Sequence, residues 1–119
     1  MTRLNVHTRA LPCGPVMTMA GELDHHSAPE VRDLLPGLSL VTGQRLLVDL
    51  GGLTFCDSSG ITVLIAARNQ ALAARATIAL VAVPDRVRRI FGIVGLEQVF
   101  PTYPTVREAA AAWTPPAAG

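Results

Sequence analysis

The chain is 119 residues long, half of its residues are apolar, and its formal charge is +1. A chain of this size can bury one hydrophobic core without metals or disulfides, so we expect a single domain, 1–113, and a short flexible tail, 114–119. Its charges are dispersed, which disfavours nucleic acid as a partner. The sequence contains no lysine, which excludes a P-loop and a Schiff-base mechanism.

Targeting and redox features favour the cytoplasm. Residues 1–7 lack the continuous apolar stretch of a signal peptide, and no apolar run reaches the roughly 20 residues that cross a bilayer. Cys13 and Cys56 have no metal-ligand spacing around them and are expected to be buried thiols in a reducing compartment. We therefore expect a cytoplasmic protein with no cofactor and no direct membrane insertion.

The N-terminal segment predicts a β-hairpin. Residues 4–8 alternate between apolar and polar, which is the period of an edge strand buried on one face. After a turn rich in proline and glycine, residues 16–20 are expected to form the second strand of the hairpin, closed by Gly21 and Glu22.

A short helix is predicted next. The segment 27–30 (SAPE) has the form of a capping box, with Ser27 as the N-cap and the Glu30 side chain reaching back to it. Pro36 and Gly37 should end or kink this helix, because proline clashes with the preceding turn and cannot donate a hydrogen bond.

The middle of the chain predicts two central strands on either side of a helix. Residues 45–50 and 77–83 are nearly continuous apolar runs, as in strands covered on both faces. A helix should begin near Ser58 and pack on the sheet through residues at helical spacing. These residues are Ile61, Leu64, Ile65 and Leu72.

The C-terminal part predicts two further helices. Pro84 is a stop, Asp85 is suited to cap the first of these helices, and Gly95 is suited to end it. Residues 98–100 are expected to form a short last strand and 104–113 a final helix. The fold class is therefore α/β, with a mostly parallel sheet of four to five strands, an antiparallel N-terminal edge strand and about four helices.

Ligands of such sheets meet the carboxyl ends of the strands, where the loops 21–26 and 55–60 are expected. The segment 57–60 (DSSG) opens an apolar helix, and on its own it favours a plain capping role for a serine, worth about 1 kcal/mol. The segment 24–26 (DHH) does not indicate a metal site, because adjacent side chains diverge and no further histidine or cysteine cluster supports it.

A longer segment, 48–60 (VDLGGLTFCDSSG), resembles the signature of the anti-sigma factor antagonists, which are STAS-domain proteins. The segment 21–26 (GELDHH) is similar to the second motif of that family. The resemblance implies that an anti-sigma factor with serine kinase activity phosphorylates Ser58. It further implies that the unphosphorylated form binds this kinase and releases a sigma factor, and that a metal-dependent serine phosphatase reverses the modification.

The resemblance also implies a partner-binding surface on the two loops. A helix N-terminus can accommodate a phosphate through free amides and the helix dipole, so release of the partner should follow from local charge rather than from refolding. Asp57 either orients the serine hydroxyl or only flanks the helix, and Ser59 is the nearest alternative site of modification. The expected partner-binding residues are Gly21, Glu22, Asp24, His25, Asp57, Ser58, Ser59 and Gly60.

Two other functions compete with this interpretation. A hydrolase would use Ser58 as a nucleophile, but the sequence has no G-x-S-x-G elbow and no histidine after Ser58, so we do not expect an enzyme. STAS domains also serve as accessory subunits of membrane transport or stress-signalling complexes. The GELDHH segment and the intact serine favour partner switching, whereas Pro29, Pro36 and the Gly51-Gly52 pair depart from the familiar pattern and bear on which partner is recognised.

Overall fold

The structure is a computed structural model that describes residues 3–96 and 98–115. Its five strands form one sheet in the order β1-β2-β3-β4-β5, with β1 antiparallel to β2 and the other neighbours parallel. The predicted α/β class is confirmed. In chain order the elements are β1 (Asn5–Leu11), β2 (Gly14–Leu23), α1 (Ala28–Leu34), a 3-10 turn (Leu35–Gly37), β3 (Arg45–Cys56), α2 (Ser58–Ala73), β4 (Thr77–Val81), α3 (Asp85–Val94), β5 (Thr102–Tyr103) and α4 (Val106–Ala111).

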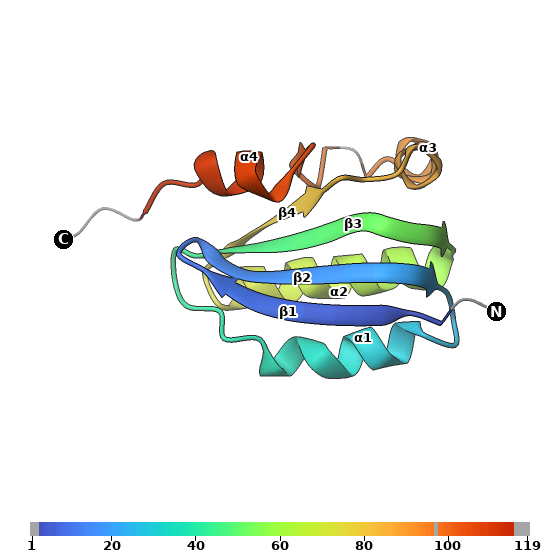
Figure 1. Ribbon diagram of the computed structural model, residues 1–119, viewed down its shortest axis with the longest axis horizontal. Helices are drawn as coiled ribbons and strands as arrows, with labels where there is room; N and C mark the ends of the chain where they lie inside the picture. The colour runs from blue at the N-terminus through green and yellow to red at the C-terminus, as the bar shows by residue number, and fades with distance from the viewer. Residues whose placement is uncertain (1–2, 97, 116–119) are drawn as a thin grey trace.

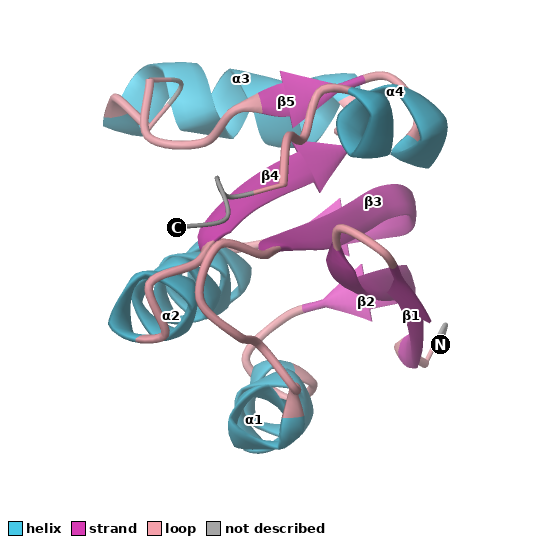
Figure 2. Cartoon of the chain, turned by 90° about the vertical axis from the view of Figure 1, so that its left-hand side faces the viewer, coloured by secondary structure: helices cyan, strands magenta, loops and turns pink. Residues whose placement is uncertain are grey.

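Helices cover the two faces of the sheet unequally. α1 and α2 lie side by side on one face, and α4 lies on the other, over the β4 end of the sheet (Figures 1 and 2). Successive side chains of β3 point to opposite faces of the sheet. Leu46 and Val48 pack in the larger core with α1 and α2, whereas Leu47 packs in a smaller core with Ala109 of α4. The carboxyl ends of β2 and β3 lie beside the start of α2 (Figure 1).

Strands β2 and β3 are longer than the sequence predicted. Each was expected to end near a glycine, but β2 continues to Leu23 and β3 to Cys56. Gly51 and Gly52 therefore lie within a strand rather than in a turn. A Cβ on Gly52 would lie 2.7 Å from the Ala20 side chain, so this glycine lets the two strands approach closely where their register shifts.

Several helix and strand details also differ from expectation. Leu72 does not pack on the sheet, because α2 buries Val63, Ala67 and Ala71 while Leu72 is 47% exposed. The last strand, expected at 98–100, is instead Thr102–Tyr103. Asp85 does not cap α3, because it is the first residue of that helix and Pro84 holds the N-cap position. Residues 116–119 of the expected tail lie outside the described residues.

Other expectations are confirmed. α1 ends at Leu34, and a 3-10 turn containing Pro36 follows it. Gly95 ends α3 in the left-handed conformation with φ 76°. Cys13 and Cys56 are both free and buried. No helix within the described part of the chain is long and apolar enough to cross a bilayer.

Candidate functional site

The pairing of β2 with β3 brings the two predicted loops together. Leu23 pairs with Cys56 at the last position of both strands. One residue later the Asp57 amide donates a hydrogen bond to the Leu23 carbonyl, at 3.2 Å. The segment 24–27 and the start of α2 therefore leave the same edge of the sheet from adjacent points.

The cap of α2 is the aspartate and not a serine. One carboxylate oxygen of Asp57 accepts hydrogen bonds from the Ser59 amide at 2.8 Å and from the Gly60 amide at 3.3 Å. The capping role that the segment 57–60 favoured for a serine is therefore wrong. Asp57 therefore accepts hydrogen bonds from two of the amides that were expected to be free to bind a phosphate.

Ser58 is the first residue of α2, and its side chain is exposed. Within the described ranges its hydroxyl takes part in no side-chain hydrogen bond, although its carbonyl accepts one from the Thr62 hydroxyl at 3.0 Å. Ser59 is less accessible, being half-buried. Ser58 thus presents an uncommitted hydroxyl to solvent at the positive end of a sixteen-residue helix.

Removing the Asp57 cap should destabilise the domain. We expect Asp57→Ala to lower the free energy of unfolding by about 1 kcal/mol, because the Ser59 and Gly60 amides lose their acceptor. Asp57→Asn is the matched control, since its amide oxygen can still accept both bonds. Urea denaturation of the three proteins measures the difference, and equal losses for both variants would contradict the capping role.

Beneath this turn lies a closely packed layer. Gly60 is buried, and a Cβ placed on it would lie 2.6 Å from Cys56 Sγ and 2.9 Å from Leu23 Cγ. Burial, with a smaller contribution from the charge of Asp57, raises the pKa of the Cys56 thiol to about 11. This thiol therefore stays protonated near neutral pH and acts as a packing group rather than a nucleophile.

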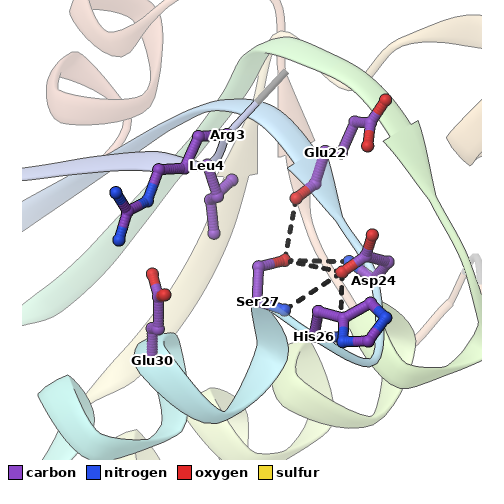
Figure 3. A pocket seen from close by; sticks show the side chains of 7 residues that line it. All are labelled: Arg3, Leu4, Glu22, Asp24, His26, Ser27 and Glu30. Atoms are coloured by element: carbon purple, nitrogen blue, oxygen red, sulfur yellow. Dashed lines mark hydrogen bonds between the residues drawn. The ribbon is translucent and has the colours of Figure 1, made fainter. Parts of the chain in front are cut away.

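The segment after β2 is held by its own hydrogen bonds (Figure 3). One Asp24 carboxylate oxygen accepts from the His26 and Ser27 amides, at 2.9 and 3.0 Å. The Ser27 hydroxyl donates to the Glu22 carbonyl at 2.8 Å. The Ser27 amide bond, helped by His26, lowers the pKa of the Asp24 carboxyl despite an opposing effect of burial.

The expected capping box at the start of α1 is wrong. Ser27 stands at the N-cap position but makes no side-chain bond to the helix, because its hydroxyl is turned back toward Glu22 and Asp24. The Glu30 side chain is exposed and its amide bonds the Ser27 carbonyl. An open pocket of about 360 Å³ lies beside this segment, lined by Arg3, Leu4, Glu22, Asp24, His26, Ser27 and Glu30 (Figure 3).

The predicted partner-binding residues fall into two groups. Side chains that reach solvent are those of Glu22, Asp24, His25, Asp57, Ser58 and Ser59. Gly21 and Gly60 are buried, so they allow close packing of the backbone and provide no side chain for a partner to contact. Gly21 has φ 110°, and a Cβ there would lie 2.3 Å from the Arg3 carbonyl oxygen, so only glycine fits at that position.

Sequence reasoning missed two neighbours of this site. Phe55 was placed in a loop, but it lies in β3 and its side chain is 44% exposed. Arg86 was not among the expected site residues, yet its guanidinium donates to the Thr54 carbonyl at 3.0 Å and ties α3 to the end of β3. No local pattern predicts the Arg86 bond, because it depends on where α3 packs relative to β3. No group of three potential metal ligands occurs in residues 3–96 and 98–115.

A family model described as STAS domain matches residues 4–109. The chain belongs to the STAS domain family. Over 81 residues it is 31% identical to the anti-sigma-B factor antagonist of Listeria monocytogenes, covering 68% of this chain and 71% of the relative.

Solved structures of other proteins share the fold described above. An anti-sigma factor antagonist from Mycobacterium paratuberculosis is 25% identical with a TM-score of 0.80, and the match covers 93% of this chain and 94% of that one. The Bacillus cell fate determinant SpoIIAA in its phosphorylated form is 21% identical with a TM-score of 0.69, covering 90% and 97%. The resemblance to anti-sigma factor antagonists is confirmed, and this STAS domain carries both sequence segments that suggested it.

Proposed function

We propose that this STAS domain is an anti-sigma factor antagonist controlled by phosphorylation of Ser58. Its unphosphorylated form binds an anti-sigma factor with serine kinase activity, and a sigma factor is released. Phosphorylation ends that complex, and a metal-dependent serine phosphatase restores it. The observation that carries the proposal is the exposed Ser58 hydroxyl, which is left uncommitted because Asp57 already caps the helix.

Local charge accounts for release without unfolding. A phosphoryl group on Ser58 would add about −1.5 to −2 charges at the positive end of α2, where the helix dipole tolerates an anion. The Ser59 and Gly60 amides are already bound to Asp57, so the phosphate stays on the outer surface beside that carboxylate. A partner surface that fits a neutral hydroxyl then meets two adjacent negative groups and a cost of desolvation.

The function is tested with purified proteins. Each serine-kinase anti-sigma factor encoded in the same genome is incubated with ATP and the wild-type protein, Ser58→Ala or Ser59→Ala, and phosphate is located by mass spectrometry. We expect one kinase to add a single phosphate to the wild type and to Ser59→Ala, and none to Ser58→Ala. Full phosphorylation of Ser58→Ala, or no phosphorylation by any of the kinases, would refute the proposal.

A further inference from the structure

An open apolar groove of about 370 Å³ runs between α2 and α3, with Ser58 at its edge. Thr62 and Ile65 belong to its α2 wall, and Ile90 and Val94 to its α3 wall. No charged side chain of the described residues lines it. The groove is therefore distinct from the pocket beside the segment 24–27, which Ser58 does not line.

The apolar surface of α3 extends beyond what the core requires. Val87 and Phe91 are buried and anchor this helix to the larger core. At the C-terminal end of the same helix, Ile93 is 84% exposed and Val94 is 54% exposed. Clustered exposed apolar side chains next to a groove are typical of protein-binding surfaces in small domains, whereas isolated ones need no explanation.

The exposed charges on α3 restrict what the groove can bind. Arg86 and Arg89 are exposed on the same helix, N-terminal to the apolar residues that line the groove. Arg86 is fixed in place through its bond to the Thr54 carbonyl. The exposed Asp85 opens the same helix, but three exposed arginines at 86, 88 and 89 outnumber it. A surface that buries apolar groups between α2 and α3 therefore gains from acidic residues placed opposite Arg86 and Arg89.

We infer that the α2–α3 groove receives a row of apolar side chains from the anti-sigma factor, flanked by acidic residues that face Arg86 and Arg89. This inference rests on the proposed function and adds the chemistry of the partner surface. It also links recognition to the switch, because Ser58 lies at the edge of the groove. A phosphate there would force the apolar row of the partner to lie against an unpaired double charge.

The test uses the kinase that phosphorylates wild-type Ser58. Its dissociation constant is measured by calorimetry, with a non-hydrolysable ATP analogue, for the wild type, Val94→Glu and Val41→Glu. Val41 is the matched control because it is 59% exposed, is the same residue type and lies outside the groove. We expect Val94→Glu to weaken binding by at least about tenfold, as for the loss of an interface anchor, and Val41→Glu to change it less than about twofold.

A second variant protects the test against a folding defect. Thr62→Arg blocks the groove from the α2 wall at an exposed position where arginine favours the helix, and it should weaken binding to a similar extent. Arg89→Glu should weaken binding and reduce its salt dependence. Binding of Val94→Glu and Thr62→Arg within about twofold of wild type would overturn the groove proposal and leave the function intact. Failure of every kinase to act on Ser58 would overturn both.

Discussion

Gly60→Val should destabilise the domain more than any other single change proposed for the site. The new Cβ would lie 2.6 Å from Cys56 Sγ and about as close to Leu23, in a layer where both neighbours are buried. Overpacking of this kind costs about 1–3 kcal/mol, and the extra methyl groups of valine place it at the upper end. The helix propensity gained by replacing glycine is smaller, at most about 1 kcal/mol, so the net effect is a loss.

Urea denaturation with Gly37→Ala as the control measures this effect. A Cβ on Gly37 meets no atom within 4 Å, so that variant should keep the wild-type midpoint or exceed it. Adding Cys56→Ala to Gly60→Ala should recover part of the loss, because it removes the nearest atom. A Gly60→Val protein as stable as Gly37→Ala would show that the turn relaxes freely and that the close packing beneath Ser58 is unimportant.

Ser58→Asp is expected to weaken binding of the kinase without lowering the stability of the domain. At the first position of α2 an aspartate is favoured by the helix dipole, so the free energy of unfolding should stay the same or rise by about 0.3–1 kcal/mol. The same charge at the partner surface should weaken kinase binding by a factor of about 30 or more, since an unpaired charge buried at an interface costs at least about 2 kcal/mol.

Calorimetry with the kinase and urea denaturation of the free protein measure the two effects separately. Ser39→Asp is a suitable control, because Ser39 is exposed in the loop after the 3-10 turn and lies outside both pockets that flank the site. It adds the same charge and should leave binding unchanged. If Ser58→Asp bound as tightly as Ser39→Asp, charge at Ser58 would not be the release signal.

The order of elements was predictable because hydrophobic periodicity is a local property. The continuous run at 45–50 indicated a central strand, and the apolar spacing after Ser58 indicated α2. The ends of the strands were not predictable in the same way. Gly51 and Gly52 look like a turn in sequence, and only the close approach of Ala20 from the neighbouring strand explains why position 52 is a glycine.

At the site, the residue types were predictable but their tasks were not. Asp57 and Ser58 are equally suited to capping a helix, and the choice depends on one residue of register that the sequence does not specify. Ser27 likewise fits a capping box, yet its hydroxyl bonds the Glu22 carbonyl instead. The groove could not be predicted from the sequence, because its two walls, α2 and α3, are separated by β4 in the chain and meet only in the fold.

The hydrogen bonds that Asp24 and Ser27 make within the free domain affect the rate of association. Since they already fix the segment between β2 and α1, little conformational entropy remains to be lost when a partner docks there. Encounter is then limited by diffusion and orientation rather than by ordering of a loop. The association rate is then set by the ordered segment, whereas the dissociation rate, and with it the lifetime of the complex, would depend on whether Ser58 is phosphorylated.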